Sequence, residues 1–254
     1  KDDYTMAVET ILKMDVDLAS INFTCELVNK WLRDNKPRYI CVSNVHMCME
    51  VYDNSSFRAV VNNSDLTVPD GLPLVWAQKL LGNVGARRVR GEDLTLDLCS
   101  HANKNGIPIG FYGASGNTLL QLEQKLKALF PMLNVVFSES PPFRTLTFEE
   151  EKGYTDLINN SGLKILFVGL GCPKQEIWMS KNKTDLNCTM IGVGAAFDFI
   201  AGNKKHAPKW MQNTGLEWLF RLMSEPKRLW KRYLKNNPRF IYLFLKQLFG
   251  RKYD

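Results

Sequence analysis

The sequence has few of the residues that build metal centres and disulfide frameworks. It contains three histidines and six cysteines, and no two cysteines form a C-x-x-C pair. Because structural metal sites draw on closely spaced histidine and cysteine pairs, this spacing argues against a metal site. Several cysteines lie within apolar runs, which is typical of reduced, buried thiols in a cytosolic protein rather than of disulfides.

Long apolar runs and the standard nucleotide-binding motifs are also missing. No stretch is apolar over the about 20 residues that a transmembrane helix needs, and no signal peptide is visible at the start. Gly110, Gly113 and Gly116 recur at intervals of three, which matches neither the dinucleotide-binding fingerprint nor a P-loop. The segment Gly192–Phe197 lacks the third small residue of that fingerprint, so a dinucleotide-dependent oxidoreductase is poorly supported.

Acidic residues are scarce in one part of the chain only. Residues 204–254 contain 13 Lys+Arg and 3 Asp+Glu, a net charge of +10, whereas residues 1–203 contain 20 and 23, a net charge of −3. A uniformly basic surface would indicate nucleic-acid binding. A basic, aromatic tail on a slightly acidic body indicates instead that one end of the molecule binds an anionic surface.

Apolar runs along the first 200 residues predict strands that alternate with helices. Clear strands are expected at 39–42, 66–68, 107–112, 135–138, 165–168 and 190–193, and one further short strand at 11–16. This rhythm is typical of a Rossmann-like α/β fold with a mostly parallel sheet flanked by helices. Such sheets bind ligands beyond the carboxyl ends of their strands.

The basic tail is predicted to form a helical appendage, residues 204–254, on an α/β core, residues 1–203. Pro226 and Pro238 are expected to divide it into three helices. The apolar block Phe240–Leu245 is too short to span a bilayer, but it suits the membrane interface because cations and aromatic residues are interleaved along the tail. Packing of this block against the core, or a dimer contact, is the alternative.

Polar residues follow several of the predicted strands and would gather at the ligand edge of the sheet. Asp70 stands between Pro69 and Gly71, where a carboxylate can act as a general base toward a hydroxyl. The alternative is a helix N-cap, which the sequence alone favours. Asn44, after the strand at 39–42, is open to the same two interpretations.

Three further signals are weaker. Gly113 opens a turn before a helix whose N-terminal amides favour a phosphate, although a tight turn explains this glycine equally well. Gln175 is expected beside the same sheet edge, with a solvated side chain as the favoured alternative. Arg88 belongs to an arginine-rich loop that is either a solvated face or a phosphate clamp, because guanidinium donors fit paired oxygens.

Seven short motifs occur together along the chain. They are PDGLP at 69–73, RVRGEDL at 88–94, SPPF at 140–143, GLGCPKQEIW at 169–178, GVGAAFD at 192–198, APKW at 207–210 and GLEWLFR at 215–221. In this order the set resembles the WecG/TagA/CpsF family of bacterial glycosyltransferases, over roughly residues 11–233. The family can carry a threonine at the position of Val42. This difference bears on which sugar is transferred and not on the type of reaction.

The resemblance implies an inverting, metal-independent transferase that uses no cofactor. Such enzymes move a sugar, N-acetylmannosamine or another hexose, from a UDP-sugar to an undecaprenyl-diphosphate-linked saccharide at the cytoplasmic membrane face, in the synthesis of cell-surface polysaccharide. By this resemblance Asp70 is the catalytic base. The implied substrate-binding residues are Asn44, Arg88 and Gln175 for the donor or the leaving diphosphate, Arg221, Arg228 and Lys231 for the diphosphate of the acceptor, and Gly113, Phe143 and Asp198 around the crevice.

The expected partners are therefore a UDP-sugar, a lipid-linked acceptor and an anionic membrane surface. A homo-oligomer formed through the core is left open, and no nucleic acid is expected. The alternative function is a nucleotide- or nucleic-acid-binding module without catalysis, which would use the same basic tail. The uneven charge and the absence of a recognised nucleic-acid motif count against it.

Overall fold

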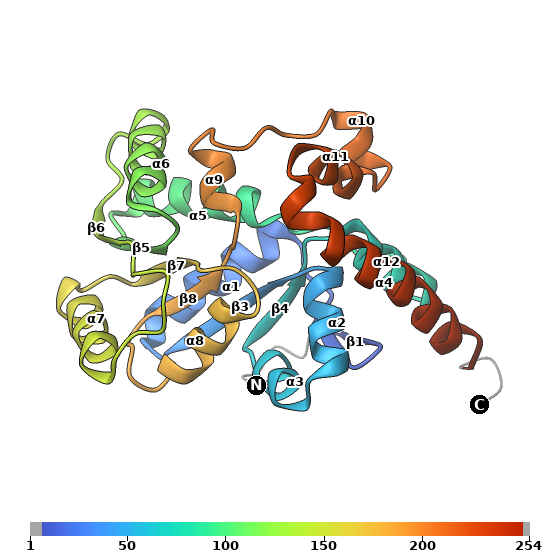
Figure 1. The fold of residues 1–254 in the computed structure, drawn as a ribbon. Helices are drawn as coiled ribbons and strands as arrows, with labels where there is room; N and C mark the ends of the chain where they lie inside the picture. The colour runs from blue at the N-terminus through green and yellow to red at the C-terminus, as the bar shows by residue number, and fades with distance from the viewer. Residues whose placement is uncertain (1–6, 251–254) are drawn as a thin grey trace.

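A six-stranded sheet forms the centre of the structure, in the order β4-β3-β8-β7-β5-β6 (Figure 1). The computed structural model describes residues 7–250. Every neighbouring pair of strands in this sheet is parallel, which confirms the predicted Rossmann-like α/β fold. The strands are β3 (Arg38–Ser43), β4 (Leu66–Pro69), β5 (Ile109–Gly113), β6 (Val135–Glu139), β7 (Ile165–Gly169) and β8 (Thr189–Gly192).

Helices cover both faces of the sheet, which explains why its central strands are continuous apolar runs. Tyr39 and Cys41 of β3 belong to one buried cluster, whereas Ile40 and Val42 belong to the other. The first cluster packs under α2 (Val45–Asp53), α3 (Ser55–Asn62), α4 (Leu72–Leu80), α7 (Phe148–Ser161) and α8 (Lys174–Asn182), and the second under α1 (Ile21–Asp34), α5 (Gly91–Asn105), α6 (Gly116–Leu129) and α9 (Ala196–Ile200).

The chain begins with a small antiparallel hairpin instead of the single strand predicted at 11–16. Strand β1 (Val8–Ile11) pairs with β2 (Met14–Asp17), and Ile11 lies opposite Met14. The prediction was wrong because the two-residue turn contains no glycine or asparagine, the usual hairpin signal. Leu12 takes the left-handed conformation there, with φ of 58°.

The appendage contains α10 (Lys209–Asn213), α11 (Glu217–Ser224) and α12 (Pro226–Gly250). Pro226 starts α12, as predicted, but the predicted break at Pro238 is wrong, because α12 continues through it. Pro238 is exposed, so water can satisfy the carbonyl that its missing N–H leaves free. Asn236 and Phe240 on either side are buried, and this packing holds the helix across the proline.

Polar contacts fix α12 to the core. The Arg239 guanidinium forms a two-point ion pair with Asp53 at the end of α2, at 2.6 and 2.5 Å. Gln247 accepts from the backbone N–H of Leu12 and donates to the carbonyl of Thr10, so it holds the hairpin turn. Within residues 7–250, no helix combines the length and the apolar content needed to cross a bilayer. The division of the chain at residue 203 stays a prediction.

Candidate active site

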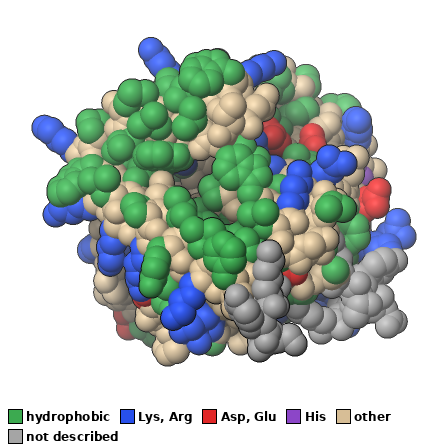
Figure 2. All heavy atoms as spheres, turned by 90° about the vertical axis from the view of Figure 1, so that its right-hand side faces the viewer, with side chains coloured by type: hydrophobic (Ala, Val, Ile, Leu, Met, Phe, Trp, Pro, Cys, Tyr) green, Lys and Arg blue, Asp and Glu red, His purple; other side chains and the backbone are tan. Residues whose placement is uncertain are grey.

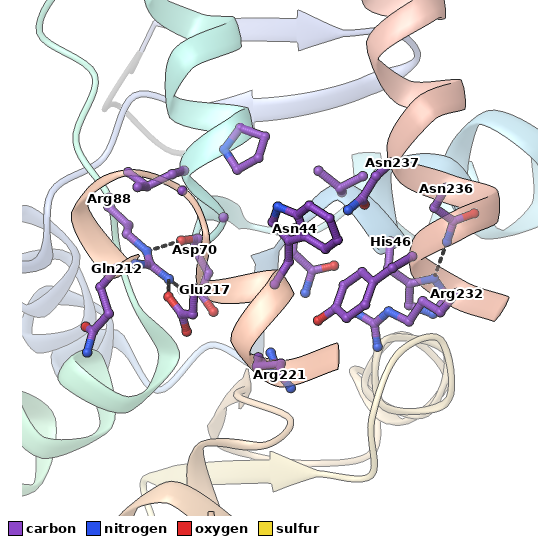
Figure 3. Close-up of a pocket in the computed structure, with 17 residues that line it drawn as sticks. Asn44, His46, Asp70, Arg88, Gln212, Glu217, Arg221, Arg232, Asn236 and Asn237 are labelled. Carbon is purple, nitrogen blue, oxygen red and sulfur yellow. Dashed lines mark hydrogen bonds and ion pairs between the residues drawn. The ribbon is translucent and has the colours of Figure 1, made fainter. Parts of the chain in front are cut away.

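Two adjoining cavities open at the carboxyl edge of the sheet. The larger, of about 510 Å³, lies over the ends of β3, β8, β7 and β5. The smaller, of about 110 Å³, lies between the start of α4 and the helices of the appendage (Figure 3). Side chains that line both cavities come from core and appendage: Asn44, Asp70, Glu217, Arg221 and Arg232.

Asp70 lies on the shared wall because β4 ends directly before it. Its backbone N–H donates to the carbonyl of Ser43 at 2.8 Å, which ties the end of β4 to the end of β3. The cap of α4 is Gly71, and α4 has no side-chain cap, so the alternative role of Asp70 as a helix cap is not realised. Its carboxylate, about 32% exposed, is therefore available to the cavities.

Asp70 and Glu217 share one arginine. Nη2 of Arg88 lies 3.3 Å from Oδ1 of Asp70 and donates to Oε2 of Glu217 at 2.8 Å (Figure 3). Nε of Arg88 donates to the backbone carbonyl of Asp70. Since Glu217 is the first residue of α11, a single guanidinium joins the core to the appendage at this point.

Burial raises the pKa of Asp70 above its ordinary value. The positive charge of Arg88 opposes this shift, and the negative charge of Glu217 adds to it. A carboxylate with a raised pKa accepts a proton more readily, which is what a general base must do. The environment of Asp70 therefore suits a general base.

Asn44, directly after β3, and Gln175, in the first turn of α8, line the larger cavity. Oδ1 of Asn44 accepts from the N–H of Met47 at 3.2 Å, so this side chain caps α2 as well as lining both cavities. Gln175 is buried, with Oε1 accepting from the N–H of Gly171 and Nε2 donating to Oε1 of Glu176. These bonds fix the orientation of the amide at the cavity floor.

The three residues predicted around the crevice differ in position. Asp198 lines the larger cavity and pairs with Lys204 at 3.0 Å, while Phe143, 84% exposed, lies at its wall. Gly113 does not line it, although Ala114 and Ser115 after it do. A Cβ at Gly113, whose φ is 116°, would lie 2.6 Å from the carbonyl carbon of Gly169, so this glycine permits the close approach of β5 and β7.

The structure brings arginines of the appendage to the cavities but not Lys231. Arg228 lines the larger cavity. Lys231 lines neither, and its ammonium lies 5.5 Å from the ring centre of Trp230. Arg232 replaces it at the site. The spacing alone does not separate the two, because residues three and four positions after Arg228, Lys231 and Arg232, are both its neighbours on a helix.

Arg221, Arg228 and Arg232 concentrate positive charge at the larger cavity. Burial, followed by the nearby positive charge of Arg221, lowers the pKa of Arg232. Its Nε atom is buried and has no hydrogen-bond partner within residues 7–250. A cluster of this kind suits an anion with several oxygens, because each guanidinium can donate to two of them. No group of three or more His, Cys, Asp or Glu in the described part of the chain is placed to hold a metal ion.

Glu217 is a second residue that the sequence analysis missed. It lies in the GLEWLFR motif, yet only Arg221 was selected from that motif. The available signal was its rarity, because residues 204–254 contain only three acidic side chains. An isolated carboxylate in a basic segment is a candidate for a specific ion pair, and here Arg88 provides it.

Aromatic and amide side chains line the smaller cavity. Trp218 and Tyr233 contribute rings, and Asn236 and Asn237 contribute amides. Asn236 donates to Nδ1 of His46 at 3.2 Å. Burial lowers the pKa of His46 to about 4, so its ring is neutral at physiological pH. A few polar groups among apolar walls are typical of a small-molecule site.

Comparison with known proteins relates nearly the whole chain to one family of glycosyl transferases. A family model described as the glycosyl transferase WecG/TagA/CpsF family matches residues 9–254. An N-acetylglucosaminyldiphosphoundecaprenol N-acetyl-beta-D-mannosaminyltransferase from Bacillus spizizenii is 29% identical over 244 residues, which cover 95% of this chain and 92% of that protein. The matched regions include both the sheet and the appendage.

Proposed function

The chain belongs to the WecG/TagA/CpsF family of glycosyl transferases, and we propose that it moves a hexose from a UDP-sugar to a saccharide linked to undecaprenyl diphosphate. The name of the Bacillus relative describes transfer of N-acetylmannosamine to a lipid-linked N-acetylglucosamine, so N-acetylmannosamine is our first choice of sugar. The proposed reaction inverts the anomeric centre and serves the synthesis of a cell-surface polysaccharide.

The observation that carries this proposal is the position of Asp70 on the wall that both cavities share. A transferase needs its base where the acceptor hydroxyl meets the anomeric carbon of the donor. The larger cavity is assigned to the UDP-sugar. The smaller cavity is assigned to the acceptor sugar, because rings can pack on its apolar faces while amides bond its hydroxyl groups.

In the proposed step, Asp70 accepts the proton of the acceptor hydroxyl as its oxygen bonds to the anomeric carbon. Attack comes from the face opposite the diphosphate, so the bond between that carbon and UDP breaks and its electron pair leaves with UDP. The resemblance assigned the cations of the appendage to the diphosphate of the acceptor. Because Arg221, Arg228 and Arg232 line the larger cavity, we assign them instead to the diphosphate of UDP, where they would donate to its oxygens and stabilise the charge that develops there. The proposal includes no metal ion for this purpose.

The experiment that tests the function is a matrix of UDP-sugars and acceptors. UDP release is measured with each donor, with and without an undecaprenyl-diphosphate-linked N-acetylglucosamine analogue, in buffer that contains EDTA. Rapid release that requires both substrates is the expected result. Release that is absent with every pair, or that needs an added divalent cation, contradicts the proposal or its metal-free part.

Arg232→Ala is expected to lower kcat/KM about 10- to 100-fold, because it removes a charge-assisted hydrogen-bond donor from the site. Lys231→Ala is the matched control, since it removes the same charge one residue earlier, where the side chain lies on Trp230. We expect its effect to be less than about twofold. Initial rates of UDP release at varied acceptor concentration measure both. Equal losses in the two variants would mean that net charge, not position, matters.

The membrane part of the proposal rests on an apolar face beside the smaller cavity. Figure 2 shows hydrophobic side chains gathered on the side of the molecule where α4 and α12 lie, with Lys and Arg around them. The exposed apolar residues of these segments include Trp76, Leu80 and Val84 from α4 and its loop, and Trp230, Leu234, Ile241, Leu245 and Phe249 from α12. Such a face, with a basic border, suits the interface of an anionic bilayer.

The double substitution Leu234→Asp with Ile241→Asp is expected to lower binding to vesicles at least tenfold. Both side chains are exposed, at 63% and 57%, so the folded protein tolerates the charges while a bilayer does not. Leu120→Asp on α6, also 57% exposed, is the matched control. Co-sedimentation with vesicles of phosphatidylglycerol and phosphatidylcholine measures binding. An equally large loss of vesicle binding in Leu120→Asp would show that binding does not depend on the apolar face of α4 and α12.

A further inference from the structure

Glu217 of the appendage contacts the same arginine as the proposed base, Asp70. Both carboxylates contact the same nitrogen, Nη2 of Arg88, and both line the two cavities. The contact with Glu217 is the shorter, at 2.8 Å against 3.3 Å for Asp70. Glu217 is 21% exposed, so this ion pair is partly withdrawn from water. The geometry is that of two acids competing for one cation.

The competition keeps Arg88 from pairing fully with Asp70. Arginine and carboxylate bind most strongly through two parallel hydrogen bonds. Here Nε of Arg88 donates to the backbone carbonyl of Asp70, and Glu217 takes the better contact of Nη2. Among residues 7–250, the carboxylate of Asp70 is left with one long contact, at 3.3 Å from Nη2 of Arg88. Without Glu217, Arg88 could turn its remaining donors onto Asp70.

A fully paired carboxylate would be a poorer base, because an adjacent guanidinium stabilises the charged form. Glu217 acts in the opposite direction through its own charge, which raises the pKa of Asp70. The other charged groups that act on Asp70 are Arg88 and Arg90 from the loop before α5 and Arg221 from α11. The remaining charged and titratable groups on the walls of the two cavities are His46, Glu92, Cys172, Asp198, Lys204, Arg228, Arg232 and Tyr233. The acids in that list form no ion pair with Arg88, whereas Glu217 shares this cation with Asp70.

We propose that Glu217 is a positioning residue, which draws Arg88 partly away from Asp70 and so keeps the carboxylate of Asp70 free to accept the proton of the acceptor. This inference rests on the function proposed above. Because Glu217 is carried by α11, the base is complete only when the appendage is seated on the core.

Glu217→Gln keeps the shape of the side chain and removes its charge. We expect the acid limb of the pH profile of kcat/KM to move down by about one pH unit, because the pKa of Asp70 falls when Arg88 pairs with it alone. The rate at pH 7 should fall about tenfold, since a weaker base accepts the proton less readily. Glu26→Gln, the same change on the exposed side of α1, should alter neither quantity.

A second measurement does not depend on turnover. The carboxyl carbon of Asp70, observed by NMR in aspartate-labelled protein and assigned with Asp70→Asn, should titrate at lower pH in Glu217→Gln than in the wild type. Glu217→Asp keeps the charge but has a shorter side chain that lies farther from Arg88. In this variant the titration of Asp70 should shift in the same direction by a smaller amount, and this variant replaces Glu217→Gln if the latter does not fold.

Two kinetic results would overturn the proposal. An unchanged acid limb with a slower rate would mean that Glu217 only holds α11 in place. A loss as complete as that of Asp70→Asn would make Glu217 the base itself. If no pair of substrates gives turnover in the wild type, the proposed function fails, while the NMR titration still decides the role of Glu217.

Discussion

Asp70→Asn is expected to lower kcat about 10³-fold, within the usual range for removing a general base. Asparagine keeps the size of the side chain and its contact with Arg88 but cannot accept the proton of the acceptor hydroxyl. The arginines that are assigned to the diphosphate are unchanged, so the affinity for UDP should change less than about threefold. UDP-release kinetics and calorimetric titration with UDP measure the two quantities.

The control for this variant is Asp97→Asn on the exposed side of α5, which makes the same chemical change away from the cavities. It should retain the wild-type rate. If Asp70→Asn also retains that rate, Asp70 is not the base. If it loses UDP binding together with turnover, the residue supports the nucleotide site and the assignment of a purely chemical role fails.

Gly113→Ala is expected to lower the free energy of unfolding by about 3 kcal/mol or more, because it forces an L side chain into a strained conformation against backbone. The new Cβ would meet the carbonyl carbon of Gly169 at 2.6 Å, with φ at 116°. Neither atom can move without parting the ends of β5 and β7, which bound the larger cavity. Urea denaturation followed by circular dichroism measures the loss.

Gly116→Ala is the matched control three residues later. A Cβ at this position has open space around it, and alanine is favoured over glycine in a helix. Its stability should equal or slightly exceed that of the wild type. If Gly113→Ala is as stable as Gly116→Ala but binds UDP more weakly, then Gly113 serves the ligand and not the packing of the strands.

The fold was predictable because local patterns and burial agree over the sheet. Strands such as β3, β5 and β8 are buried along their whole length, so apolar residues dominate their sequences. The two errors arose where tertiary packing, rather than the local sequence, determines the backbone conformation. Leu12 turns the hairpin without the residues that signal a turn, and α12 continues through Pro238 because its neighbours are held against the core.

The candidate site was predictable only on the core side. Parallel strands place the residues that follow them at one edge, which is enough to bring Asn44, Asp70 and Gln175 together. The orientation of the appendage on the core is a tertiary property that no local pattern encodes. Glu217 and Arg232 were therefore missed, and Lys231 was selected although it lies outside both cavities.

The central claim is that Asp70 lies where the donor and acceptor meet. A crystal structure of the protein with UDP and a short-chain acceptor analogue tests it most directly. We predict that the diphosphate of UDP occupies the larger cavity near Arg228, and that an acceptor hydroxyl lies about 3 Å from a carboxylate oxygen of Asp70. UDP bound elsewhere, or an acceptor whose hydroxyl groups all lie beyond the reach of Asp70, would contradict it.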